Sequence, residues 1–176
     1  MRRVVTGHKA GKSVFLETGP PSQVLKMNSL PGMEIAALWA TGKVPAVPGD
    51  GADPTLAPAS GLPRPGETSF GFIRLPGTAE IPPDFEPAAF GREFLAKAPA
   101  LAACFEAENP GMHTTATIDY VIVVSGEVWL ELDDGQEVRV EAGDVVVQQG
   151  TRHAWRNRSA EGCVLAAVMI GAEHRR

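Results

Sequence analysis

Apolar and polar residues alternate over much of the chain after Gly111, and this pattern predicts a series of short β-strands. Apolar and polar residues alternate over residues 128–132, and residues 133–135 are expected to form a tight turn. Val138 and Val140 then provide the apolar positions of the return strand. Glycines 126, 135, 143 and 150 punctuate the strands about seven to nine residues apart, which is typical of a sandwich or a barrel. Residues 120–124 are apolar at every position, so we expect this strand to be buried on both faces.

The first 75 residues also predict extended structure. Residues 2–17 are expected to form a hairpin, and residues 33–40 and 69–75 two further strands. Between these strands, residues 44–67 contain six prolines and four glycines, which favours a long loop. No group of residues in this half of the chain suggests catalysis.

Residues 84–107 are the only stretch that predicts helix. Phe90 and Phe94 lie four residues apart, and Pro99 is expected to end one helix and begin the next. The apolar side of this segment must pack on another element, most simply on the outside or over one mouth of a β-barrel. A movable lid is the functional alternative.

Composition narrows the class of protein. A chain of 176 residues fits one domain with an extension, and a net charge of -5 gives no reason to expect nucleic acid as a partner. No apolar run reaches the length of a signal peptide or a membrane span, so we expect no membrane partner and a cytoplasmic protein. The two cysteines, Cys104 and Cys163, do not have metal-ligand spacing, and a disulfide between them is open but not required.

Candidate metal ligands lie near both ends of the β-rich half: His113, Asp119 and His153. Two imidazoles and one carboxylate are sufficient for a divalent metal. A continuous strand would place His113 and Asp119 ~20 Å apart. A shared site therefore requires the chain to bend within residues 114–118. The alternative is that both histidines are ordinary, hydrogen-bonded barrel residues.

The same stretch resembles the cupin superfamily, the RmlC-like jelly-roll barrels. Their first motif is G, five residues, HxH, three or four residues, E, six residues, G. Counting back from Gly126 places Asp119 at the Glu position, Thr115 at the second His and His113 at the first. The opening Gly of the motif is replaced by Ala107.

The second cupin motif is G, five residues, PxG, two residues, H, three residues, N. Here Gly143 begins the match, His153 takes the ligand position and Asn157 follows after three intervening residues. The Pro is missing and the spacing is one residue shorter. The strings HxTxxxDY and GDVVVQxGTxHAW look like those of a group of small bacterial and fungal cupins.

The resemblance implies an all-β fold, a cupin-type double-stranded β-helix (jelly-roll) barrel with an N-terminal β extension and a short helical segment. We expect residues 1–68 to form the extension and the Pro/Gly-rich loop, and residues 69–176 the barrel, including helical segment 84–107. The resemblance also implies a divalent metal (Fe, Zn, Mn or Ni) at His113, Asp119 and His153. A homodimer is expected because the N-terminal hairpin is too poor in apolar residues to form its own core.

Further residues are candidates for a role beside the metal. Thr115 replaces a family ligand and can hydrogen-bond a substrate oxygen, and Gln148 either orients a substrate or simply ends a strand. Trp155 forms either a pocket wall or part of the core. Arg152 and Arg156 either meet a carboxylate substrate or are exposed loop charges.

Three functions remain open from the sequence. The first is a metal-dependent enzyme acting on a small carboxylate, carbonyl or aromatic compound by oxygenase, decarboxylase, lyase or isomerase chemistry. The second is a non-catalytic module that binds a small molecule. The third is a metal-free enzyme that uses His113 or His153 as acid or base.

Overall fold

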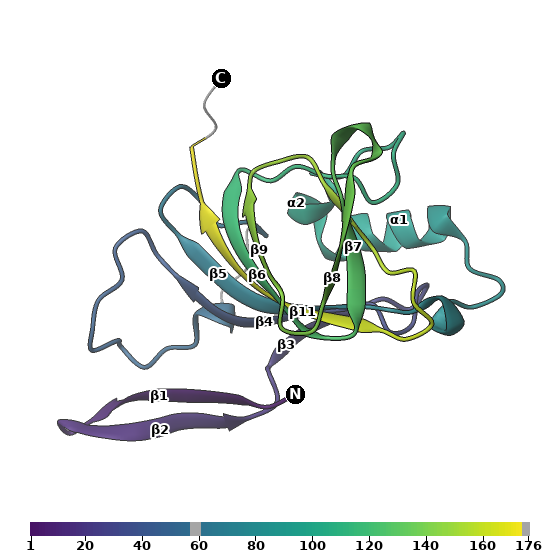
Figure 1. Cartoon of the computed structure of the whole chain (residues 1–176). Coiled ribbons are helices and arrows are strands. Elements are labelled where there is room, and N and C mark those ends of the chain that lie inside the picture. Colours follow the sequence, from purple (N-terminus) through teal and green to yellow (C-terminus); the bar gives the residue numbers. More distant parts are fainter. Residues whose placement is uncertain (57–60, 174–176) are drawn as a thin grey trace.

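The computed structural model describes residues 1–56 and 61–173. Its barrel strands are β3 (Gln23–Lys26), β4 (Glu34–Thr41), β5 (Thr68–Leu75), β6 (Thr117–Ser125), β7 (Glu127–Glu131), β8 (Glu137–Glu141), β9 (Val145–Gln149), β10 (Ala154–Arg156) and β11 (Cys163–Gly171). They form a six-stranded sheet in the order β3-β4-β5-β11-β6-β9 and a three-stranded sheet in the order β10-β7-β8. The two sheets face each other (Figure 1). The predicted all-β jelly-roll fold is confirmed.

The core lies between these two sheets. Val121 and Val123 of β6 point into it, with Leu165 of β11 as the antiparallel partner of Val123. Val128 of β7 and Val140 of β8 meet them from the smaller sheet. Each of these side chains is at most 7% exposed. Because successive side chains of a strand point to opposite faces, each sheet directs one apolar face into the core.

The prediction that residues 120–124 are buried on both faces is wrong. Only Val121 and Val123 are buried, whereas Tyr120, Ile122 and Val124 are 47–48% exposed. The reason is that no described element covers the outer face of β6. The outward side chains of this strand are apolar although they lie at the surface.

The N-terminal hairpin is confirmed as β1 (Arg3–Lys9) and β2 (Lys12–Gly19), which pair only with each other. It extends away from the barrel (Figure 1). Its turn lies at Ala10 and Gly11, both with positive φ. The next strands, β3 and β4, continue the large sheet beyond β5, so residues before the expected boundary at 68 contribute to the barrel.

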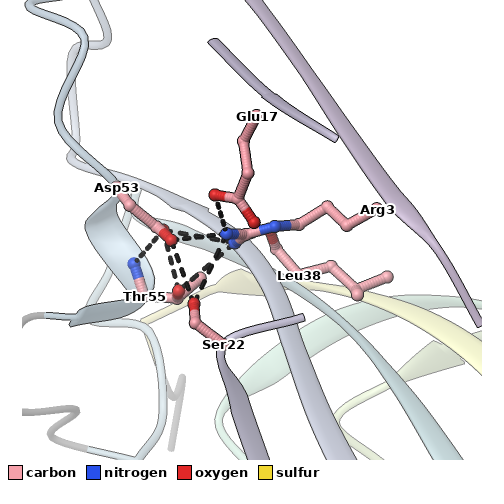
Figure 2. Close-up of polar contacts among 6 residues, drawn as sticks. All are labelled: Arg3, Glu17, Ser22, Leu38, Asp53 and Thr55. Carbon is pink, nitrogen blue, oxygen red and sulfur yellow. Dashed lines mark hydrogen bonds and ion pairs between the residues drawn. The ribbon is translucent and has the colours of Figure 1, made fainter. Parts of the chain in front are cut away.

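One arginine connects the hairpin to the rest of the chain. Arg3 on β1 has a side chain only 5% exposed and bonds Asp53 at 2.6 Å and Glu17 at 2.5 Å. It also donates to the backbone oxygen of Leu38 on β4 at 3.1 Å. Figure 2 shows Ser22 and Thr55 completing the same network. The network joins the hairpin, β4 and the loop after β4.

The predicted helical segment is confirmed as α1 (Pro87–Lys97) and α2 (Pro99–Ala102), with Pro99 at the first position of α2. The expected long loop contains η1 (Pro54–Leu56), and residues 57–60 lie outside the described part. Shorter turns are η2 (Thr78–Glu80) and η3 (Asp133–Gly135). Among the described residues, no helix has the length and apolar character needed to cross a membrane. Cys104 and Cys163 are both free thiols.

Candidate functional site

The fold brings His113 and His153 side by side. They form an antiparallel bridge in which the amide of His113 donates to the carbonyl of His153 at 2.9 Å, and the reverse bond is 3.0 Å. Their ring centroids are 4.2 Å apart. Gly150 makes this possible, since its positive φ turns the chain after β9 and its Cα faces the backbone oxygen of Thr115 closely enough that a Cβ would lie 3.3 Å away.

Both imidazoles are held with the same nitrogen toward the backbone. Nδ1 of His113 lies 3.1 Å from the carbonyl oxygen of Gly111, and Nδ1 of His153 lies 2.9 Å from that of Thr151. A carbonyl oxygen only accepts, so in each neutral ring Nδ1 carries the proton and donates it. Nε2 is left with its lone pair, which is the form that coordinates a metal or accepts a proton.

Burial keeps both rings neutral. Desolvation lowers the pKa of His113, with the bond to Gly111 opposing the shift. Desolvation and then the neighbouring His113 lower the pKa of His153 to about 4. At neutral pH the two Nε2 lone pairs are therefore available.

Asp119 faces the same interior from β6. Its side chain is buried, and its Oδ1 atom has no hydrogen-bond partner. Desolvation raises the pKa of its carboxyl, while a hydrogen bond from Thr117 opposes the shift. A buried carboxylate oxygen without a partner is costly in the absence of a ligand, and a cation or a donor would satisfy it.

The required bend is present, because the backbone bends at Ala116 directly before β6. Even so, no three His, Cys, Asp or Glu side chains within residues 1–56 and 61–173 lie close enough to hold a metal ion. His113 and His153 are brought together, whereas Asp119 lines the same cavity without joining them in a group of three. The donors fit a metal in their chemistry, and the three-ligand site stays a prediction.

The two predicted polar neighbours also face this interior. The Thr115 hydroxyl is buried and lies 2.8 Å from that of Thr117. Gln148 is the cross-strand neighbour of Asp119 and is 3% exposed, and its amide nitrogen donates to the hydroxyl of Thr151. Both residues line the cavity that contains the histidines.

This cavity has a volume of about 790 Å³ and lies between the large sheet, β10 and the helical segment. Ile35, Ala37 and Trp39 of β4 line it. Trp155 of β10 lines the wall beside His153, at 5.9 Å between ring centroids, and also packs against the core. Trp155 therefore fulfils both roles that the sequence left open.

Phe105 is a site residue that the sequence did not reveal. Its ring stacks on His113 at 4.4 Å and 15°, and it forms a bridge to the same residue. Phe94 of α1 packs edge-on against Phe105 at 5.4 Å. The spacing of the phenylalanines predicts an apolar helical side, but nothing in the spacing indicates that this side ends on an imidazole.

The arginines near the site already have partners. Arg152 bonds Glu106 at 2.6 Å and Asp133 at 2.8 Å. Arg156 bonds Glu131 at 2.6 Å.

Asn157 fixes a turn, as its position in the sequence suggests. Its amide donates to the carbonyl of Glu161 at 2.8 Å, and its side-chain oxygen accepts from the amide of Ser159 at 3.0 Å.

Comparison with known proteins places the site within a family domain. Residues 106–170 match the family model described as a cupin domain. The chain is 54% identical over 48 residues to phomopsin biosynthesis cluster protein C′ of Diaporthe leptostromiformis, covering 27% of this chain and 25% of that protein. It is 42% identical over 62 residues to a cupin-domain-containing oxidoreductase of Neurospora crassa, covering 35% and 31%. The chain thus spans about a quarter to a third of the length of these relatives.

Solved structures are similar at low sequence identity. A cupin family protein with a double-stranded β-helix fold from Methanocaldococcus jannaschii is 14% identical, with 59% of this chain and 70% of that chain covered and a TM-score of 0.38. A cupin protein from Bacteroides fragilis is 12% identical, with 62% and 70% covered and a TM-score of 0.38.

Proposed function

Because the chain belongs to the cupin superfamily, we propose that it is a metal-dependent enzyme whose substrate, a small molecule, binds inside the barrel. The observation that carries the proposal is the pair of buried, neutral histidines with free Nε2 lone pairs, in a cavity that is also lined by Asp119 with its unpartnered Oδ1. Three relatives are named as oxidoreductases, which favours a redox reaction, the class that includes oxygenases, over decarboxylase, lyase or isomerase chemistry.

His113 and His153 are the residues that would hold a divalent metal, with Asp119 as the third ligand. Two imidazoles and one carboxylate suit Fe(II) and also satisfy Zn²⁺, and Mn or Ni are further candidates. When bound, such an ion supplies a Lewis acid or an oxygen-activating centre.

The remaining residues position a substrate and limit water. Each carbonyl of Gly111 and Thr151 fixes the orientation of one imidazole, as outer-shell partners of metal-binding histidines do. The buried Thr115 hydroxyl and the Gln148 side chain present polar groups on the same cavity wall as Asp119. Phe105 against His113 and Trp155 against His153 limit the access of water to the imidazoles, which strengthens polar contacts made there.

Metal titration of the purified protein tests the proposal. We expect one divalent ion per chain by calorimetry and elemental analysis, and loss of stoichiometric binding in His113→Ala and His153→Ala. His8→Ala is the matched control, since His8 is exposed on the hairpin. Asp119→Asn replaces a proposed carboxylate ligand by a neutral amide and is expected to weaken affinity by at least the roughly 10- to 100-fold that loss of an outer-shell partner costs.

The proposal is wrong if metal-replete wild-type protein retains no ion, or if His113→Ala and His153→Ala bind as well as His8→Ala.

A binding module without catalysis is the second candidate. The cavity of about 790 Å³ is large enough for a drug-sized ligand, and no group of three metal donors lies together in the described ranges. Ligand binding that is tight and unaffected by a chelator, with no turnover in metal-loaded protein, would favour this function.

A further inference from the structure

The N-terminal hairpin has one apolar face that no described element covers. Side chains alternate along β1, so Val4 and Thr6 share a face, and Phe15 is the cross-strand partner of Thr6. Val4 and Phe15 are both exposed. On the opposite face, Leu16 lies against Gly7 in space that a Cβ would need. The side that carries Phe15, called here the Phe15 face, is therefore the one open to a partner.

The hairpin is basic, whereas the rest of the chain is acidic. Residues 1–19 carry four basic side chains and one acidic side chain, a net charge of +3, so residues 20–176 together carry -8 and the whole chain -5. Lys9 and Lys12 are cross-strand partners at the tip, and both are exposed. Within the described ranges, neither has an ion-pair partner. Two neighbouring cations without a counter-charge favour an acidic partner surface.

The outward side of β6 and β9, the β6–β9 face, has the complementary properties. Exposed apolar side chains form cross-strand pairs there, among them Tyr120 with Val147. One end of the face is acidic, because Glu141 ends β8 and Asp144 comes directly before β9, and both are exposed. As the last strand of the large sheet, β9 also presents an open edge.

The hairpin of the same copy is held away from this face. Arg3 fixes the base of the hairpin to Leu38 of β4 and to Asp53 in the loop after β4 (Figure 2). In the large sheet, β5 and β11 separate β4 from β6. From this anchor the hairpin extends away from the barrel (Figure 1). A second copy of the chain is therefore the partner that both surfaces fit, since it brings a basic hairpin and an acidic, apolar face together.

We infer that two copies exchange their hairpins, so that the Phe15 face of each hairpin lies on the β6–β9 face of the other copy. The two lysines at the tip then meet Glu141 and Asp144. Each contact occurs twice in such a two-fold pair, and the exchange closes after two copies. A two-stranded hairpin is marginally stable alone in water, and the exchange gives it a third surface to pack on. No metal or substrate enters the inference, so it is independent of the proposed function.

Photochemical cross-linking tests the placement of the hairpin. Full-length protein with p-benzoylphenylalanine at position 15 is mixed with isotope-labelled wild type and irradiated. We expect cross-links that join residue 15 of the unlabelled chain to residues 118–124 or 145–149 of the labelled chain. The same photoreactive residue at position 95, an exposed site on α1, is the control and should give no cross-links between copies.

Charge reversal tests the contact at the tip. We expect Lys9→Glu combined with Lys12→Glu to raise the dissociation constant of the dimer at least about tenfold in sedimentation velocity, because each lost contact is lost twice. Adding Glu141→Lys and Asp144→Lys to the same chain should restore the dimer.

The control for the reversal is Lys43→Glu combined with Arg92→Glu, which makes the same change in net charge at exposed positions outside the hairpin. Its dissociation constant should stay within about twofold of wild type. Circular dichroism and thermal unfolding confirm that each variant is folded.

A monomeric wild type overturns the inference, as do cross-links from position 15 that stay within one copy or reach another surface. A folded hairpin reversal that dimerises as tightly as its control also overturns it, as does a folded four-residue variant that fails to restore the dimer. Monomeric wild type that binds vesicles of anionic phospholipid would assign the hairpin to a membrane surface and equally overturn the exchange. The metal titration above does not depend on any of these results.

Discussion

At the scale of single residues, the two histidines are oriented by the same local device. Each Nδ1 bonds the carbonyl two residues earlier, Gly111 for His113 and Thr151 for His153. Neither ring depends on a distant side chain for its tautomer. The orientation and the tautomer of each ring are therefore fixed before a ligand binds, which lowers the free-energy cost of binding.

Asp119 lowers the folding stability of the metal-free protein at neutral pH. Its folded-state pKa is raised by burial, so the folded protein favours the protonated form and loses stability as the pH rises through the carboxyl range. Asp119→Asn removes this penalty at neutral pH. We expect the metal-free variant to be about 1 kcal/mol more stable, or about 2–4 °C higher in Tm, by thermal unfolding in chelator.

The control for this prediction is Asp84→Asn at an exposed position, which should leave Tm unchanged. A lower Tm for metal-free Asp119→Asn than for wild type would contradict the prediction.

Asp53, unlike Asp119, stabilises the folded protein at neutral pH. The Arg3 guanidinium holds the pKa of the Asp53 carboxyl well below its ordinary value. Its stabilising contribution is therefore complete above the unfolded pKa of about 3.9 and is lost as the pH falls through the lower folded value. We expect Asp53→Asn to lower the free energy of unfolding by about 1.5–3 kcal/mol at pH 7, measured by urea denaturation.

The same denaturation series at lower pH should show the difference between wild type and Asp53→Asn shrinking as Asp53 is protonated. Asp50→Asn, three residues away and exposed, is the control. A difference that stays constant down to the acid transition would contradict the role of the Arg3–Asp53 pair.

At the scale of elements, the helical segment supports the histidines through ring contacts. Phe90 stacks on Phe94 at 5.7 Å, Phe94 meets Phe105, and Phe105 stacks on His113. The contacts run from the surface helix α1 to the site without interruption. The segment is part of the wall of the cavity as well as a packed cover.

Phe94→Ala tests this support, because Phe94 is 6% exposed and its removal leaves a cavity. We expect a loss of about 3–5 kcal/mol in the free energy of unfolding by urea denaturation. Leu95→Ala on the same helix is the control: Leu95 is 56% exposed, so the change should be within about 0.5 kcal/mol. Similar losses for the two variants would show that the segment does not pack on the barrel as described.

The alternation of apolar and polar residues and the helical spacing of apolar residues predict most helices and strands of this chain. They do not predict which other elements pack against each helix or strand. The pattern of β6 identifies the strand, yet an all-apolar run cannot tell a doubly buried strand from one whose outer face is a bare apolar surface. Strand β3 is missed because four residues carry too little periodicity. The histidine pair follows from the resemblance to a known motif, whereas the stacking of Phe105 on His113 depends on long-range folding that no local pattern encodes.

At the scale of the whole molecule, the part of the chain that the structure describes leaves apolar side chains exposed on the outer face of β6 and β9 and on the hairpin. The outer face of β6 and β9 exposes uncharged side chains at Ile118, Tyr120, Ile122, Val145 and Val147. The hairpin exposes further apolar residues, among them Phe15 at 74%. Apolar surfaces of this kind mark interfaces, and β9 is also an open edge of the sheet.

We therefore expect a homodimer in which a second copy covers the β6–β9 face. Sedimentation velocity at micromolar concentration should give the mass of a dimer for wild type. Ile122→Lys combined with Val147→Lys should shift it to the monomer while the barrel stays folded. Val138→Lys, at an equally exposed position on the other sheet, is the control and should remain dimeric. A monomeric wild type would contradict the expectation.

We propose that His113, His153 and Asp119 together hold a metal, and anomalous scattering from crystals of metal-loaded protein tests this most directly. We predict one anomalous peak about 2.0–2.2 Å from both Nε2 atoms and from a carboxylate oxygen of Asp119. Crystals grown with saturating metal that show no peak between the two imidazoles would contradict the account.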